Sequence, residues 1–393
     1  MFVSKVSSLD TDVEKCGNTV HIYDVLKPFL TILNIAGLHM PIERGRMSSA
    51  MSIIYSVFIH IVLGSTLCRY FIRYTDEVYT VESWMAVLSY AGFQSSGMYF
   101  GSATCVGVNK HLHKFFRQYD SYRDTHASTM DNLALRRNIR LFLFLAAFAV
   151  IICVPILYFM LLHNVDPAVV YLKPMKLLPR EYFPVVKAIF FIVFCLIVVQ
   201  AVFTLAFFCF LTNCLFKEFK QLNAELTSLF GNKEGDAQKS YIERIRHQFE
   251  DTCSLVSTVN KVFMHMIGSG YIASVPIICL MLYGLIKDEL MKKEYAMLLT
   301  CILFGVIVVG STLLASVALN IKAHSSLMHL LMADFAELSD TSLNIVNIFI
   351  TRLTTTKIGY TVYNLFTIDC STILMLTGTM LTYVVVILQF KPD

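Results

Sequence analysis

The stretch Cys370–Phe390, CSTILMLTGTMLTYVVVILQF, contains no charged residue, and its length decides the fold class. A helix that crosses the hydrocarbon core of a bilayer needs about 20 predominantly apolar residues. Six further stretches without charge precede it, each with a charged residue at both ends: Met47–Cys68, Ser83–Asn109, Leu141–Val165, Ala188–Phe216, Val262–Ile286 and Tyr295–Ile321. Runs of this length predict helices rather than strands. We therefore expect an all-α membrane protein with seven transmembrane helices.

The composition agrees with a chain surrounded by lipid. Hydrophobic residues make up 56% and charged residues 15% of the 393 residues, and the mean hydropathy is +0.62, whereas soluble proteins carry about 25% charged residues. We expect one membrane domain, residues 47–390, with cytoplasmic helix extensions at about 214–261 and 322–369. A cytoplasmic segment, residues 1–46, precedes this domain, and a short extracellular tail, residues 391–393, follows it.

Lysine and arginine predict the orientation, because cytoplasmic connections retain them. The two most basic connections follow the second and the fourth stretch. They hold Lys110, Lys114, Arg117, Arg123, Arg136, Arg137 and Arg140, and Lys217, Lys220, Lys233, Lys239, Arg244, Arg246 and Lys261. Both connections are cytoplasmic only if the N-terminus is, and an odd number of spans then places the C-terminus outside the cell.

Motifs for catalysis or cofactor binding are absent from the sequence. No G-x-S-x-G, H-E-x-x-H, Walker loop or glycine-rich dinucleotide turn occurs. We expect no enzyme, no catalytic residue, no cofactor, no metal site and no nucleic-acid partner. His60, Gln200 and His265 are polar residues at membrane depth, where we expect hydrogen bonds between helices rather than ligand contacts. Pro155 and Pro276 are expected to interrupt the third and fifth spans.

The last stretch carries the most specific motif. Thr382-Tyr383 is followed by five apolar residues and then by Gln389-Phe390. The segment before it, IGYTVYNLFTIDCSTILML (residues 358–376), contains a small residue, a Phe and an aliphatic residue followed by Asp369. This pattern resembles the signature of the insect gustatory receptor family, a branch of the insect chemoreceptor superfamily.

The resemblance implies a ligand-gated, nonselective cation channel in the plasma membrane of a chemosensory neuron. It implies a homotetramer, or a heterotetramer with other gustatory receptors, whose seventh helices line one pore for monovalent and divalent cations. Val386, Gln389 and Phe390 would form the pore and gate, because they fall on neighbouring parts of one helix face and an apolar ring can gate by dewetting. Gln389 near the outer surface could instead reach the lipid headgroups. Thr382 and Tyr383 would hydrogen-bond to neighbouring helices.

Asp369 has two candidate roles at the start of the seventh span. In a tetramer, four such carboxylates would form a ring that draws cations to the inner mouth of the pore. An Asp directly before Cys370-Ser371-Thr372 also suits the cap of a helix. The two roles are compatible, and capping alone is favoured by a small margin.

The resemblance places the ligand pocket in the outer halves of spans two to six. Such pockets are apolar and aromatic with a few polar groups. The candidates for ligand contact are Trp84, Tyr90, Gln94, Tyr158, Phe159, Phe194, Tyr283 and Tyr295. Each of them is also a candidate for simple packing, and Trp84 for an anchor at the membrane interface.

The expected ligand is a small-molecule tastant of low polarity, such as a bitter or plant-derived compound, because the seven stretches contain no acidic residue. Sugar-responsive members often carry Glu directly after Thr-Tyr, where this chain has Val384. The alternatives are a sugar-responsive receptor and an odorant receptor of the same superfamily. A G-protein-coupled receptor is more remote, because it needs the opposite orientation, and so is a secondary transporter, because no internal repeat occurs.

Overall fold

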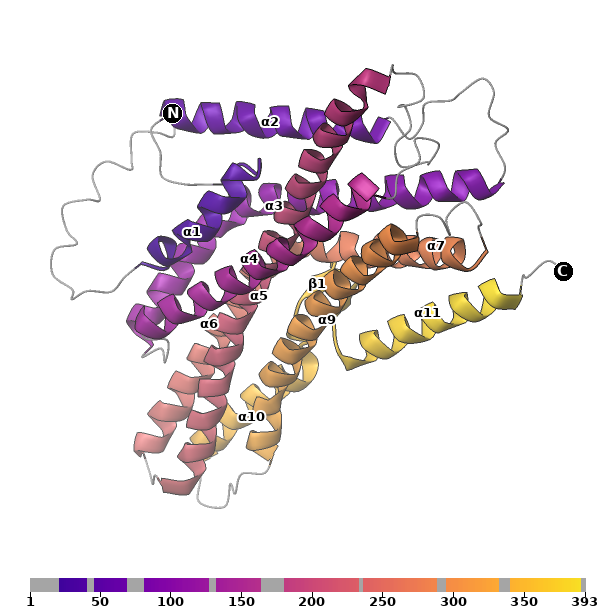
Figure 1. Cartoon of the computed structure of the whole chain (residues 1–393). Helices are drawn as coiled ribbons and strands as arrows, with labels where there is room; N and C mark the ends of the chain where they lie inside the picture. Colours follow the sequence, from indigo (N-terminus) through magenta and orange to yellow (C-terminus); the bar gives the residue numbers. More distant parts are fainter. Residues whose placement is uncertain are drawn as a thin grey trace.

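The computed structural model of the chain is almost entirely helical (Figure 1). It describes residues 21–40, 46–68, 81–126, 132–163, 180–232, 236–287, 295–331 and 340–389. The helices are α1 (Ile22–Ile35), α2 (Arg46–Cys68), α3 (Val81–Thr125), α4 (Asn132–His163), α5 (Phe183–Asn232), α6 (Asp236–Ile272), α7 (Ser274–Lys287), α9 (Tyr295–Leu331), α10 (Asp340–Thr355) and α11 (Cys370–Gln389). A 3-10 turn, Arg180–Tyr182, precedes α5, and the strands β1 (Thr361–Val362) and β2 (Phe366–Thr367) precede α11.

Five helical segments among the described residues are long and apolar enough to cross a membrane. They are Ala50–Cys68, Leu133–Ile156, Phe183–Ser228, Ser240–Tyr283 and Leu298–Leu331. These segments overlap the first, third, fourth, fifth and sixth predicted spans. The second predicted span falls on α3 and the seventh on α11, whose described apolar part, Cys370–Tyr383, is shorter. The helical class is thereby confirmed, and the number of seven spans stays a prediction.

One face of α4 shows why this fold suits a bilayer. Leu141, Phe144, Phe148 and Ile151 follow one another at steps of three or four residues, and all are more than half exposed. A soluble monomer rarely presents so continuous an apolar face. The hydrocarbon interior of a membrane would cover this face without cost.

Aromatic side chains form the centre of the bundle, where α5 passes α6. Phe207 and Phe208 of α5 meet Phe263 of α6 edge to face, with ring centroids 5.6 and 5.3 Å apart. All three side chains are fully buried, and the edge-to-face arrangement is the one that aromatic pairs prefer. Beyond this centre, α5 continues to Asn232 and α6 begins at Asp236, so these two helices run as a pair through the predicted extension at residues 214–261 (Figure 1).

Helix α1 lies within the cytoplasmic segment, residues 1–46, for which the sequence predicted no helix. Its buried residues Ile22, Val25, Leu26, Phe29 and Leu33 recur at the spacing of one helical face. The helix packs against α3, α4 and α5, and Phe29 lies 6.0 Å from Phe207 between ring centroids. The apolar period is visible in the sequence, but a helix of 14 residues is too short to cross a bilayer.

The fifth predicted span, Val262–Ile286, is not one helix but two. Helix α6 ends at Ile272 and α7 begins at Ser274. Pro276 lacks the N–H that would bond to the carbonyl of Ile272, and its ring crowds that carbonyl, so the helix breaks there. Pro155 was also expected to interrupt its span, but α4 continues through it.

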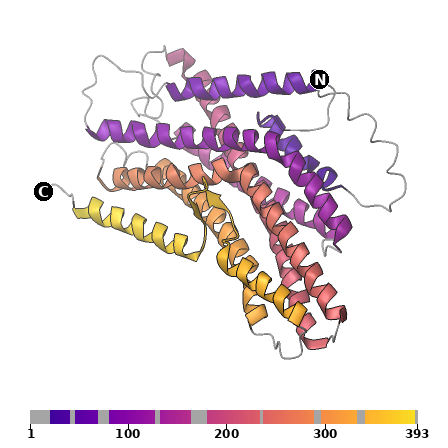
Figure 2. The same ribbon diagram turned by 180° about the vertical axis from the view of Figure 1, so that it is seen from behind.

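A small β-hairpin joins the bundle to α11. Strands β1 and β2 pair antiparallel, with Val362 opposite Phe366. Tyr363 and Asn364 in the turn have φ values of 48° and 60°, the left-handed conformation that both central residues of a type I′ turn need. After this turn, α11 runs beside α7 at the edge of the bundle (Figures 1 and 2).

Candidate functional site

A small apolar cavity lies between four helices of the membrane region. Its volume is about 50 Å³. The lining residues are Phe93, Ser96, Gly97 and Phe100 of α3, Ile197 and Ala201 of α5, Ser274, Ile277, Ile278 and Met281 of α7, and Cys301, Phe304, Gly305 and Val308 of α9. No lining side chain is charged. Ligand pockets usually measure about 300–1,000 Å³, so a ligand larger than a few atoms must displace side chains to enter.

Glycines and an aromatic pair shape this cavity. A Cβ at Gly97 would lie 2.8 Å from Cγ2 of Ile197, so only glycine lets α3 approach α5 this closely. Phe93 of α3 and Phe304 of α9 close another side, with ring centroids 6.2 Å apart at an edge-to-face angle of 68°. Close contacts of α3 with α5 and α9 therefore set the shape of the cavity.

The predicted ligand-contact residues whose side chains the structure describes do not line this cavity. Tyr90 and Phe194 are buried in an apolar cluster that also contains the cavity residues Ile278, Met281 and Cys301, so they lie behind the lining. Tyr158 is 53% exposed and packs on the ring of Phe191.

Three further candidates, Trp84, Phe159 and Tyr295, have side chains outside the part of the chain that the structure describes. Tyr283 is half-buried on α7 and also does not line the cavity. Of the residues that do line it, Phe93, Gly97 and Phe100 recur at steps of four and three residues. This spacing marks one helix face in the sequence, but only packing shows that the face meets a cavity.

Gln94 was predicted to contact ligand, and the structure assigns it to a contact between helices. Its Nε2 donates hydrogen bonds of 2.6 Å to Oγ1 of Thr66 and 3.3 Å to the carbonyl of Leu63, both on α2. Gln200 acts similarly, because its Nε2 donates to the carbonyl of Ala36 at 2.7 Å. The expected interhelical hydrogen bond of Gln200 is thus confirmed.

His60 and His265, the other two polar residues at membrane depth, do not form the predicted hydrogen bonds between helices among the described residues. Nδ1 of His60 hydrogen-bonds at 2.7 Å to the carbonyl of Ser56 in its own helix. The ring of His265 lies edge to face on Tyr363, with centroids 5.6 Å apart. His265 therefore contacts the hairpin next to α11 rather than another span.

The hairpin is held by polar contacts from several helices. Asn260 of α6 accepts a hydrogen bond from the backbone N of Thr361 at 3.0 Å and donates one to its Oγ1 at 2.8 Å. Just before the hairpin, Asn320 of α9 donates to the carbonyl of Ile358 at 2.7 Å. The buried hydroxyl of Tyr360 lies 3.0 Å from Oγ1 of Thr212 on α5.

Tyr363 connects the hairpin to α3 near the cavity. Its hydroxyl lies 3.3 Å from the hydroxyl of Tyr99, which stands between the lining residues Gly97 and Phe100. Its ring also covers Gly268 of α6 so closely that no Cβ would fit there. A residue other than glycine at φ near +50° carries backbone strain, and these contacts hold Tyr363 in that conformation.

Asp369 caps α11, as the favoured interpretation predicted. Its Oδ1 accepts hydrogen bonds from Oγ of Ser371 at 2.5 Å and from the backbone N and Oγ1 of Thr372, both at 3.1 Å. The hydrogen bond from Ser371 is the largest cause that lowers the pKa of Asp369 below its ordinary value. The carboxylate therefore stays ionised at neutral pH.

The motif residues of α11 point away from the rest of the chain. Val386 and Gln389 are exposed, and Tyr383 is 53% exposed. Oγ1 of Thr382 donates to the carbonyl of Gly378 in its own helix at 2.8 Å, so the expected bond to a neighbouring helix does not form within one chain. Phe390 lies outside the described residues.

Comparisons with known proteins agree with this architecture. A family model described as 7tm Chemosensory receptor matches residues 26–393. The structure of the insect olfactory receptor OR5 from Machilis hrabei is similar, with a TM-score of 0.68, 15% sequence identity, and coverage of 94% of this chain and 99% of that chain. The same receptor in complex with eugenol matches with a TM-score of 0.65, 15% identity and the same coverage.

At this identity the likeness to solved structures shows the fold, and no curated protein sequence matches the chain. The matched family model spans nearly the whole sequence. The predicted resemblance is therefore confirmed at the level of the chemosensory receptors, while the choice between gustatory and olfactory stays a prediction. The chain belongs to the 7tm chemosensory receptor family.

Proposed function

We propose that this protein is a gustatory receptor: a tetrameric, nonselective cation channel of the plasma membrane that a small tastant opens. The observation that carries the proposal is the Thr382-Tyr383 and Gln389-Phe390 motif on α11, a helix whose apolar surface is largely uncovered within one chain. Leu374, Met375 and Leu381 are 75%, 58% and 63% exposed. Copies of α11 from other subunits, and lipid, would cover this surface around a common pore.

The ligand would enter the cavity between α3, α5, α7 and α9. Phenyl rings and aliphatic groups dominate its lining, and the hydroxyls of Ser96 and Ser274 and the thiol of Cys301 are its polar side-chain groups. A sugar would leave most of its hydroxyls without partners there, which costs free energy for each one. The lining favours an uncharged, mainly apolar molecule. The similar receptor OR5 is known in complex with a small molecule, eugenol.

Ligand binding would open the channel by favouring one conformation over another. A ligand that widens the cavity shifts α3 relative to α7 and α9. Tyr99 lies on α3 between two lining residues, and Tyr363 carries its movement to the hairpin that starts α11. Val386 and Gln389 would then move with α11 as pore residues, and Asp369 would stand at its inner end.

An olfactory receptor of the same family is the second candidate, and the similar fold of OR5 supports it. The two candidates differ in ligand and partner rather than in architecture. Whole-cell recording of the chain expressed alone, under water-soluble tastants and volatile odorants and with G-protein signalling blocked, separates them. A rapid cation current evoked by tastants supports the proposal, and a current that the block abolishes would contradict a channel.

Filling the cavity should weaken the response. We expect Ser96→Leu to raise the ligand concentration for half-maximal current about ten-fold or more, because overpacking a closed site costs about 1–3 kcal/mol. Ser95→Leu is the matched control, because Ser95 is the preceding residue and does not line the cavity. Equal effects of the two substitutions would place the ligand elsewhere.

Two substitutions of Asp369 separate its possible roles. Asp369→Ala removes the hydrogen bonds to Ser371 and Thr372 and should lower the free energy of unfolding by about 1 kcal/mol. Asp369→Asn retains an oxygen acceptor, so we expect thermal stability and single-channel conductance close to those of the unmodified protein. A clear loss of cation conductance in Asp369→Asn would show that the negative charge also acts on permeating ions.

A further inference from the structure

A row of basic side chains follows the second predicted span along α3. Lys110, Lys114 and Arg117 are spaced by four and three residues, so they share one face of the helix, and all three are exposed. Lys261 is exposed on α6, which packs along α3, directly before the fifth predicted span. We call the contact line between residues 110–126 of α3 and 248–261 of α6 the α3–α6 seam.

His111 indicates that these charges gather in one place. The residue is half-buried. Its pKa is lowered first by burial and then by the positive charges of Lys110, Lys261 and Lys114. Positive charges from both helices therefore act on one imidazole at the membrane end of the seam.

A polar cavity continues the seam away from the predicted membrane boundary. Its volume is about 350 Å³, within the usual range of sites for small molecules. The lining residues are Arg117, Gln118, Ser121, Tyr122 and Thr125 of α3 and Asp251, Ser254 and Leu255 of α6. Apart from Leu255, every one of these side chains carries a hydrogen-bonding group, so the cavity suits a hydrophilic ligand.

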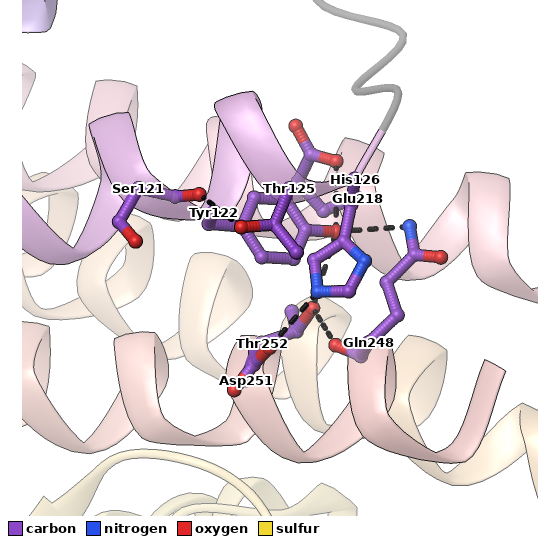
Figure 3. Close-up of polar contacts among 8 residues, drawn as sticks. All are labelled: Ser121, Tyr122, Thr125, His126, Glu218, Gln248, Asp251 and Thr252. Atoms are coloured by element: carbon purple, nitrogen blue, oxygen red, sulfur yellow. Dashed lines mark hydrogen bonds and ion pairs between the residues drawn. The ribbon is translucent and has the colours of Figure 1, made fainter. Parts of the chain in front are cut away.

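The floor of this cavity is a fixed hydrogen-bond network (Figure 3). The hydroxyl of Tyr122 donates to Oε2 of the fully buried Glu218 at 3.2 Å and accepts from Nε2 of Gln248 at 3.2 Å. Nε2 of His126 lies 2.9 Å from Oδ2 of Asp251. These bonds join α3, α5 and α6 and give the site a rigid base.

The wall of the cavity keeps groups available for a ligand. Gln118 is held across the seam, because its Oε1 accepts from Oγ1 of Thr258 at 2.7 Å and its Nε2 donates to Oγ of Ser254 at 3.4 Å. By contrast, among the described residues none forms an ion pair or hydrogen bond with the guanidinium of Arg117 or the hydroxyl of Ser121. Arg117 therefore offers a charge-assisted donor to an anion.

Distances along α3 limit which anion can use the whole seam. At 1.5 Å per residue, Arg117 lies about 10 Å and Ser121 about 16 Å beyond Lys110. The headgroup layer on each side of a bilayer is only about 5–8 Å thick. An ordinary headgroup such as phosphatidylserine would reach Lys110 and Lys114 but not the cavity, whereas a phosphorylated ring that projects from the membrane would reach both.

We propose that the α3–α6 seam binds the phosphorylated inositol headgroup of an inner-leaflet phosphoinositide. The lysines contact phosphate at the membrane, and Arg117 binds a ring phosphate deeper in the seam. The ring hydroxyls donate to Asp251, which would repel a bare phosphate, and bond with Ser121 and Ser254. Basic clusters just cytoplasmic of a membrane helix attract such lipids. The placement in the inner leaflet rests on the cytoplasmic N-terminus that the sequence predicts and on the membrane receptor of the proposed function.

The test is retention of phosphatidylinositol 4,5-bisphosphate by the purified full-length chain in phosphatidylcholine nanodiscs. We expect the lipid to be retained in preference to phosphatidylserine supplied at equal total charge. The double substitution Lys114→Gln/Arg117→Gln should weaken retention about ten-fold or more. Ser121→Leu, which fills the cavity and removes no charge, should weaken it several-fold.

The control for loss of a positive charge outside the seam is Lys220→Gln on α5, whose effect per charge is compared with that of the double substitution. Lys220 is exposed and lies four residues beyond the fourth predicted span, at a depth like that of Lys114 but outside the seam. The proposal would be overturned if the control lost as much retention as the double substitution, or if phosphatidylserine were retained as well as the phosphoinositide. Either result would indicate a general charge effect. Soluble inositol trisphosphate is tested in lipid-free detergent. If it binds as tightly as the lipid binds in nanodiscs, the natural ligand is a soluble inositol phosphate and not a membrane lipid.

This measurement is independent of channel activity and of orientation, because both leaflets of the nanodisc contain the lipid. A chain that conducts in response to tastants but does not retain the lipid would overturn only the present proposal. A chain that retains the lipid but carries no current would contradict only the proposed function. Size-exclusion chromatography confirms that each variant is folded before retention is compared.

Discussion

Replacing Gly107 by alanine is expected to prevent most of the protein from folding. A Cβ at this position in α3 would lie 2.0 Å from the carbonyl oxygen of Val262 in α6 and 2.9 Å from the carbonyl carbon. Both obstructing atoms belong to a helix backbone, which cannot turn aside as a side chain can. The cost should therefore lie at or above the upper end of the about 1–3 kcal/mol typical of overpacking.

The measurement is the yield of monodisperse protein after extraction and the amount that reaches the cell surface. Gly310→Ala is the control, because Gly310 lies within α9 and a Cβ there meets nothing within 4 Å. Alanine favours a helix by about 1 kcal/mol over glycine, so this control should be neutral or slightly stabilising. Equal yields of the two variants would show that α3 and α6 do not approach so closely in the membrane.

The second large effect concerns the hairpin before α11. In Gly268→Ala, the new Cβ would lie 2.1 Å from Cε2 of Tyr363. The ring cannot simply rotate away, because its hydroxyl lies 3.3 Å from that of Tyr99 and the ring packs against His265. The hairpin must shift, and α11 follows it directly. We expect the protein to reach the membrane with its ligand-evoked current changed about ten-fold or more, since about 1–3 kcal/mol of strain now favours one state.

A double substitution tests the cause of this effect. Tyr363→Ala removes the ring that collides with Ala at position 268, so Gly268→Ala/Tyr363→Ala should respond more normally than Gly268→Ala alone. Such a rescue is the mark of two residues in direct contact. Gly270→Ala, two residues further along α6 with nothing within 4 Å, should behave like the unmodified protein. If the double variant is no better than the single one, Tyr363 does not connect α6 to α11.

Both predictions depend on close approaches that glycine permits, and the sequence shows only that glycines are present. Gly107, Gly268, Gly270 and Gly310 all lie within helices. Two of them face another element at less than van der Waals distance, and two face open space. Helix packing decides whether a glycine faces another element or open space. Alanine is expected to destabilise the protein in the first case and to be neutral or stabilising in the second.

The sequence alone determined the helical membrane class and the family. Long uncharged runs predict helices because a lipid interior leaves backbone groups no partner outside their own helix. The α11 motif lies in one short stretch, so it can be recognised without any three-dimensional information. The cap of α11 by Asp369 was also predictable, because its partners Ser371 and Thr372 lie within three residues.

Tertiary structure decided the cavity, the hairpin and the α3–α6 seam. Tyr90 and Phe194, which the sequence predicts as ligand contacts, pack behind the cavity. Their position could not be predicted, because aromatic composition does not reveal which side of a helix faces an opening. Strands of two residues are too short to show any periodicity, so the hairpin at Tyr363 could not be predicted. Each of these features joins residues from separate helices, and their positions follow from packing forces that act between helices distant in the sequence.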